Sequence, residues 1–127
     1  MKIKIKQLTQ YTISTFEKII EQKAIDIAKI YYLVKAIKDI QEVITNYDKS
    51  RVLLIKKYMK KGEKIENNQV VIENAEEFNE QIEILNDIEI ELNLPFIFIE
   101  DVVEILNCNE LQTLNLLGIL VSKKVGE

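Results

Sequence analysis

Residues 25–61 read IDIAKIYYLVKAIKDIQEVITNYDKSRVLLIKKYMKK and contain neither glycine nor proline. Apolar side chains recur here at alternating steps of three and four residues, interrupted only at Arg51, which is the spacing of one face of an amphipathic helix. The pattern predicts a long helix over 25–61, on the order of 55 Å in length. We call this apolar series the seam; it comprises Ile30, Leu33, Ile37, Ile40, Ile44, Tyr47, Leu54 and Tyr58.

The end of the long helix is predicted from its last charges. Lys60 and Lys61 suit the negative end of the helix dipole, and Gly62 suits a left-handed C-cap. The same helix carries a second apolar flank, so we expect it to be covered on more than one side, either by the rest of the chain or by a second subunit. The flank comprises Ile27, Tyr31, Val34, Val43, Val52 and Ile55.

Composition indicates a single folded domain in the cytoplasm. The chain has 127 residues, 47% of them hydrophobic, which is enough to bury a core and argues against disorder. It has one cysteine and no histidine, so no internal disulfide is expected. The N-terminal residues lack the apolar run of a signal peptide, and no stretch approaches the length of a membrane-spanning helix.

Charge is divided unevenly along the chain. Residues 1–64 carry 15 basic and 7 acidic side chains, whereas residues 65–122 carry 13 acidic side chains and no basic one. The simplest expectation is that the two halves fold against each other and neutralise their charges. The alternatives are head-to-tail self-association, or a partner that binds one face.

Shorter elements are predicted on either side of the long helix. Lys2 to Lys6 alternates in period two and predicts a strand over 2–6. A helix over 10–23 follows, with Ser14 and Glu17 at capping-box spacing. No glycine or proline separates it from the long helix, so one continuous helix from residue 10 is the alternative.

The second half predicts a hairpin over 64–72, around two asparagines. Asn74 then caps a helix over 75–87, and alternation predicts a strand over 88–92 and a short extended segment at 96–99. Two helices, over 101–106 and 110–120, close the chain. The first residue of the last helix follows Asn109, and Gly118 inside that helix suggests close packing.

These elements predict an α+β fold that is mainly α. Shorter helices pack on the long central helix, and a small antiparallel sheet lies at one end of the molecule. We expect the sheet to be built from 2–6, 64–72 and 88–92.

The residues for catalysis are scarce, so the sequence predicts a protein that is not an enzyme and that holds no cofactor or metal. The commonest general base, histidine, is absent, and Cys108 has no neighbouring cation to activate it. The alternative is a metal-dependent enzyme that uses the acidic residues. These are Glu76, Glu77, Glu80 and Glu83, together with Glu89, Glu91, Glu100 and Asp101.

Nucleic-acid binding is a third, less favoured alternative. Basic side chains cluster near the end of the long helix, beside Tyr47 and Tyr58. Both tyrosines belong to the seam, and the chain is acidic overall, so we expect the basic cluster to pair with the acidic half instead. The cluster comprises Lys49, Arg51, Lys56, Lys57, Lys60, Lys61 and Lys64.

The order of features resembles a family of small proteins from tailed phages and prophages of Gram-positive bacteria. The resemblance rests on the opening Met-Lys-Ile-Lys strand, on Leu53 to Tyr58 (LLIKKY), on Glu76 to Asn79 (EEFN), on the acidic segment Leu85 to Leu92 and on the Leu-rich end. It implies a phage origin and transfers no functional residue. The stretch Phe96 to Ile99 is more apolar than that family suggests.

Together these observations predict a non-enzymatic protein that binds a protein partner of the phage or its host. Two versions are open: a virion or tail-assembly factor, or an inhibitor of a host defence protein. The seam also allows a homodimer through the long helix, or a compact monomer whose last helix folds back along the seam. The candidate partner-binding residues are Ile37, Ile44, Tyr47, Lys56, Lys57, Lys60, Lys61, Glu76, Glu80 and Glu83.

Overall fold

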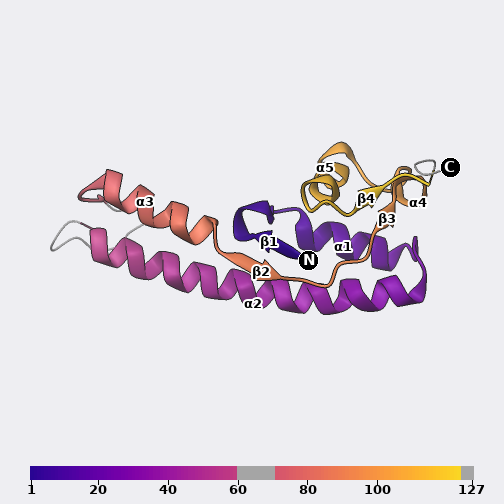
Figure 1. Ribbon diagram of the computed structural model, residues 1–127, viewed down its shortest axis with the longest axis horizontal. Helices are drawn as coiled ribbons and strands as arrows, with labels where there is room; N and C mark the ends of the chain where they lie inside the picture. Colours follow the sequence, from indigo (N-terminus) through magenta and orange to yellow (C-terminus); the bar gives the residue numbers. More distant parts are fainter. Residues whose placement is uncertain (60–70, 124–127) are drawn as a thin grey trace.

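The structure, a computed structural model, describes residues 1–59 and 71–123. One helix, α2 (Ile27–Tyr58), runs the length of the elongated molecule, and the other elements lie along one side of it (Figure 1). The predicted α+β, mainly helical class is confirmed. Over the N-terminal half of α2 lie α1 (Thr12–Glu21) and α5 (Cys108–Leu116), and along its C-terminal half lies α3 (Ala75–Asn86).

The long helix begins and ends at identifiable signals. The Asp26 side chain caps its start by accepting a hydrogen bond from the backbone N–H of Lys29 at 3.0 Å. Its end comes earlier than the predicted Lys61, because Met59 is extended and forms an antiparallel bridge with Ile72. The predicted hairpin over 64–72 lies outside the described residues, except for its last two.

The first helix is separate from α2, as predicted, but the break comes from an unexpected residue. Lys23 adopts a left-handed conformation with φ of +51°. Its N–H donates to the Ile20 carbonyl, and the N–H of Ala24 donates to the Ile19 carbonyl. These two hydrogen bonds form a Schellman motif, in which a lysine occupies the position that glycine usually takes.

The predicted capping box of the first helix is wrong. The helix begins at Thr12, so Ser14 lies inside its first turn and donates its hydroxyl to the Tyr11 carbonyl at 3.1 Å. The turn that leads into this helix is stabilised by Thr9 instead, whose hydroxyl accepts a hydrogen bond from the N–H of Tyr11 at 3.1 Å.

Among the described residues, two short strands form the antiparallel sheet, and it lies beside the middle of α2 rather than at the predicted end of the molecule (Figure 1). β1 (Lys2–Lys4) pairs with β2 (Glu89–Glu91), with the buried Ile3 opposite Ile90. Both predicted strands exist in shorter form. The first ends at Lys4, because Ile5–Gln7 forms a 3-10 helical segment, η1, and the second covers only Glu89–Glu91 of the predicted 88–92.

The C-terminal segment differs most from expectation. β3 (Ile97–Phe98) pairs in parallel with β4 (Leu120–Val121), so the last helix does not extend to residue 120. α4 (Ile99–Val102) is shorter and begins earlier than the predicted 101–106 helix. Gly118 has φ of +73°, and a Cβ there would meet nothing within 4 Å. It therefore ends α5 as a left-handed C-cap residue, and the close packing predicted there is wrong.

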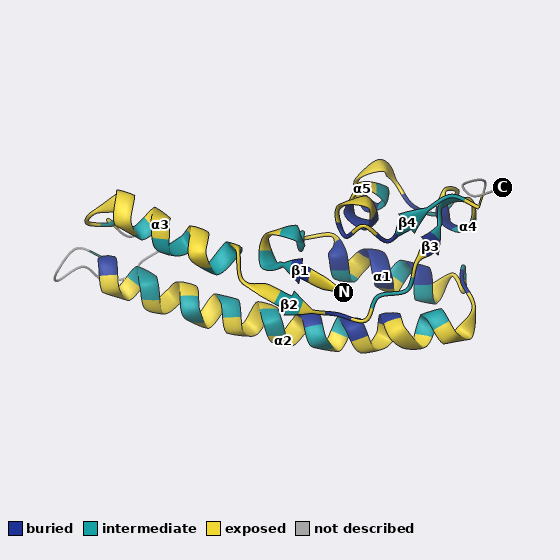
Figure 2. Ribbon diagram, viewed as in Figure 1, coloured by how far each residue is buried: buried dark blue, intermediate teal, exposed yellow. Residues whose placement is uncertain are grey.

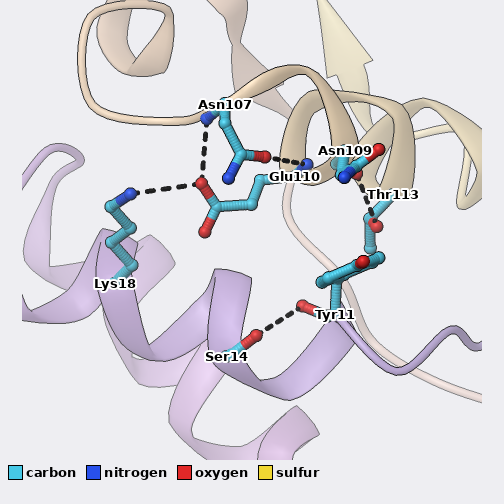
Figure 3. A network of polar contacts seen from close by, with 7 residues as sticks. All are labelled: Tyr11, Ser14, Lys18, Asn107, Asn109, Glu110 and Thr113. Atoms are coloured by element: carbon cyan, nitrogen blue, oxygen red, sulfur yellow. Dashed lines mark hydrogen bonds and ion pairs between the residues drawn. The ribbon is translucent and has the colours of Figure 1, made fainter.

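A polar network fixes α5 against α1 (Figure 3). Asn107 and Glu110 form a capping box: the Asn107 side chain accepts from the Glu110 N–H at 2.9 Å, and Glu110 accepts from the Asn107 N–H at 2.8 Å. The cap therefore lies two residues before the predicted Asn109. Lys18 of α1 donates to the nearly buried Glu110 carboxylate at 3.1 Å. These hydrogen bonds hold the pKa of Glu110 below its usual value, chiefly through the Asn107 N–H.

Burial is concentrated at the N-terminal half of α2 (Figure 2). There α1, α2 and the C-terminal segment enclose the core, whereas α3 contributes no fully buried residue. The segment that includes Leu92 and Ile97 crosses this region and supplies two of its buried side chains. Other members of the core are Phe16, Ile19, Leu33, Ala36, Ile40, Val102, Leu106, Leu114, Leu117 and Ile119.

Candidate functional site

The seam of α2 belongs mainly to the core of a single chain. Leu33 and Ile40 are fully buried, and Ile37 is half-buried against the same cluster. α1 covers the N-terminal part of the seam and α3 lies along its C-terminal part, while Ile44 between them stays 39% exposed. Of the candidate partner-binding residues on the seam, Ile37 therefore serves the core.

Ile44 and Tyr47 lie together at a small groove of about 290 Å³ between α2 and η1. Ile44 is 39% exposed, and Tyr47 is half-buried. The Tyr47 hydroxyl donates to the side-chain oxygen of Asn86, the last residue of α3, at 2.8 Å. Tyr47 thus joins two helices, and this groove is narrow for a protein partner.

The basic end of α2 is exposed, but its tyrosine is not. Lys56 and Lys57 are exposed, and the Lys57 ammonium lies 5.3 Å from the centre of the Tyr58 ring. The Tyr58 hydroxyl donates to Glu77 at 2.8 Å, and this hydrogen bond raises the pKa of Tyr58. The candidates Lys60 and Lys61 lie outside the described residues.

The acidic candidates Glu76, Glu80 and Glu83 are all exposed on α3. Glu77 differs from them, because it accepts hydrogen bonds from both Tyr58 and the Asn74 side chain. Within residues 1–59 and 71–123, no group of three or more acidic, cysteine or histidine side chains is placed to hold a metal ion.

Ion pairs connect the two halves of the chain mainly through its first 18 residues. Lys6 contacts the Asp87 carboxylate at 2.9 Å, and Lys18 contacts Glu110 at 3.1 Å. The Lys6 ammonium holds the pKa of Asp87 below its usual value. Within the described part of the chain, no lysine of α2 forms an ion pair with α3. The pairing predicted for the basic cluster is therefore absent among its described members.

An exposed apolar stripe runs along the N-terminal half of α2, about a quarter-turn around the helix from the buried seam. Ile27, Tyr31 and Val34 are spaced one turn apart and are 80%, 63% and 54% exposed. The Tyr31 ring packs edge to face against the ring of Tyr32, at 5.4 Å between centroids. The second flank of α2 was expected to be covered; the single chain leaves Ile27, Tyr31, Val34 and Val52 exposed and half-buries Val43 and Ile55.

Tyr32 connects the stripe to a pocket of about 670 Å³. One wall of the pocket comes from Ala28, Lys29 and Tyr32 of α2, and the other comes from the segment 92–98. Phe96 projects from that segment and is 57% exposed. The aromatic surface, as we call it, comprises this pocket together with Ile27, Tyr31, Val34 and Phe96.

The segment 92–98 presents Phe96 because it is anchored on both sides of it. Leu92 and Ile97 are both buried. The backbone N–H of Leu92 donates to the Met1 carbonyl at 2.9 Å, and that of Ile97 donates to the Ile119 carbonyl at 2.8 Å. Pro95 lies between the anchors, where its missing N–H costs no ladder hydrogen bond. Between the anchors, Leu94 packs against the core, whereas Asn93 and Phe96 are exposed.

Aromatic side chains gather at this surface. Four aromatic residues are exposed among those that the structure describes, and three of them, Tyr31, Tyr32 and Phe96, lie here. Both parts of the aromatic surface are visible in the sequence. The part on α2 corresponds to the i, i+4, i+7 spacing of the second flank, and the other part corresponds to the apolar stretch Phe96 to Ile99. Only the fold shows that the two meet.

The fold and this surface define a mainly helical α+β protein with an open aromatic face. Comparison with protein-family models, curated proteins and solved structures finds no match for the chain. In the described part of the chain, none of the helices combines the length and apolar character needed to cross a bilayer.

Proposed function

We propose that this protein is not an enzyme and acts by binding a protein partner through the aromatic surface. The observation that supports the proposal is the clustering of exposed Tyr31, Tyr32 and Phe96 with Ile27 and Val34. Tyrosine and phenylalanine are enriched in protein interfaces, because they contribute much apolar area for little conformational entropy. Solvent exposure of such a cluster costs solubility, so an occupant is its simplest explanation.

The size of the surface suits the centre of an interface. An aromatic side chain buries about 150–250 Å² when covered, so three half-exposed rings offer roughly 300 Å². With the two aliphatic residues, the patch reaches the upper part of the range seen for functional patches on monomers, about 300–600 Å². A standard interface covers about 800 Å² on each partner, so polar residues around the patch complete it.

The resemblance to phage proteins sets the expected partner: a virion component, or a host protein that the phage inhibits. The nucleic-acid alternative gains no comparable support, because Tyr47 and Tyr58 at the basic end form internal hydrogen bonds. The metal alternative rests on two groups of acidic residues. Those of α3 lie along an exposed helix face, and in the second group Glu91 pairs with the N-terminal ammonium and Asp101 with Lys123.

The test is partner capture by matched variants. Tagged wild-type protein is compared with a Tyr31→Ser, Phe96→Ser double variant in extracts of the source cells, with Leu53→Ser as the control. Leu53 is also on α2 and is 68% exposed, but it lies far from the pocket. We expect the wild type and the control to retain the same protein and the double variant to lose it at an unchanged melting temperature. Equal retention by all three would refute the proposal.

A further inference from the structure

The chemistry of the pocket in the aromatic surface indicates what kind of partner it suits. Its walls are mostly apolar and aromatic, and no aspartate or glutamate lines it. Lys29 is the charged side chain in the lining. This is unexpected in a chain with 21 acidic and 17 basic residues.

The Lys29 ammonium lies 4.5 Å from the centre of the Phe98 ring. Lys123 approaches the same ring at 5.4 Å but is balanced by Asp101, to which it donates at 2.8 Å. Lys29 forms no ion pair with any residue in 1–59 or 71–123. Its nearest acidic neighbour in sequence, Asp26, accepts from the helix N-terminus instead. The positive charge in the pocket is therefore left without a carboxylate among these residues.

Two further lysines, which do not line the pocket, lie along the same half of α2, together with Asp39. Lys35 and Lys38 are exposed on the same half of α2, one to three turns beyond Lys29. Apolar walls strengthen an electrostatic interaction, because they keep water away from the charged groups. The complement of such a site is an apolar group that carries a negative charge.

We propose that the partner docks an acidic, apolar segment here: a bulky aliphatic or aromatic side chain fills the pocket, and a neighbouring carboxylate binds Lys29. This inference rests on the proposed function and specifies the partner's chemistry. A pocket of about 670 Å³ lies within the usual range for ligand sites, roughly 300–1,000 Å³, and has room for one large side chain and part of the next. Charge complementarity selects this occupant over a basic or neutral one.

Two synthetic peptides test the inference on the full chain. Acetyl-Leu-Phe-Asp-Glu-Leu-amide carries two carboxylates, and acetyl-Leu-Phe-Asn-Gln-Leu-amide has the same shape without them. Each is titrated into the ¹⁵N-labelled protein, and amide shifts are followed at Lys29, Tyr32 and Phe96. The titrations are repeated with Lys29→Met, and with Lys56→Met, which removes the same charge from the far end of α2.

We expect the acidic peptide to bind about fivefold more tightly than the neutral one, the effect of one partly exposed ion pair. The preference should disappear in Lys29→Met and persist in Lys56→Met. Equal binding of the two peptides at the pocket would overturn the inference, yet leave the aromatic surface as an apolar docking site.

Three further outcomes would also overturn it. These are shifts that lie outside the pocket, an acidic preference that survives Lys29→Met, and no binding of either peptide. Peptide binding that weakens as the protein concentration rises would assign the pocket to a second copy of the chain instead. Partner capture by the wild type in the preceding experiment is independent of all these outcomes, so the two proposals fail separately.

Discussion

Two leucines on α2 allow one substitution to be compared in opposite environments. Leu33 is fully buried in the core of the chain, and Leu53 is 68% exposed. Replacing either one by alanine changes helix propensity by the same small amount, so the difference between the variants reports tertiary burial alone. The pair therefore tests whether one chain supplies the whole environment of the seam.

The expected magnitudes differ widely. Leu33→Ala leaves a cavity among packed side chains, which typically costs about 2–5 kcal/mol of unfolding free energy. Leu53→Ala removes little contact and should change the free energy of unfolding by no more than about 0.5 kcal/mol. At roughly 4 °C per kcal/mol for a domain of this size, Leu33→Ala lowers the melting temperature by on the order of 10 °C, and Leu53→Ala by about 2 °C or less.

The assay is thermal and urea unfolding followed by circular dichroism, at protein concentrations that span a hundredfold range. A core within one chain predicts a wild-type melting temperature that does not depend on concentration, since no association is coupled to folding. Equal losses for the two variants would refute the burial reasoning. A melting temperature that rises with concentration would show that a second chain completes the seam.

Three further outcomes are expected. Ile40→Glu should unfold the protein because it places an unpaired charge in the core, whereas Ile44→Glu, at a 39% exposed position, should leave it folded; circular dichroism distinguishes them. Because the pKa of Glu110 is lowered in the folded state, its contribution is complete above the ordinary glutamate value of 4.5 and is lost as the pH falls through the folded-state pKa. Glu110→Gln should therefore lower the melting temperature at neutral pH. In acid, the difference in melting temperature between this variant and the wild type should become smaller. Tyr58→Phe should remove a tyrosine whose ionisation is displaced to higher pH, because its hydrogen bond to Glu77 raises its pKa, and absorbance titration near 295 nm measures this.

Periodicity predicted the elements whose signals are local. The apolar spacing of the seam correctly predicted that Leu33 and Ile40 are buried, because the spacing of a helix face does not depend on which element covers it. Asn74 was identified as the cap of α3 from its own position and that of Glu77, and it accepts from the Glu77 N–H at 3.3 Å. Alternation likewise found both strands of the antiparallel sheet.

Features that depend on tertiary context could not be predicted in this way. Lys23 ends α1 at positive φ, although nothing in its side chain favours that conformation. Gly118 was interpreted as a packing residue inside a helix, because the Leu spacing continues past it to Leu120, which instead pairs in β4. Phe96 could be assigned to the surface only once its anchors were known, since burial of Leu92 and Ile97 decides which way the loop points.

Site-specific photo-crosslinking in the source cells tests whether the aromatic surface binds a partner, because it reports contacts at chosen positions in the living cell. p-Benzoylphenylalanine is placed in turn at Tyr31, Phe96 and Leu53, three exposed positions of which only the first two belong to the aromatic surface. We expect one shared crosslinked protein from the positions of Tyr31 and Phe96 and no such product from that of Leu53. The same product from all three positions, or none from Tyr31 and Phe96, would contradict this expectation.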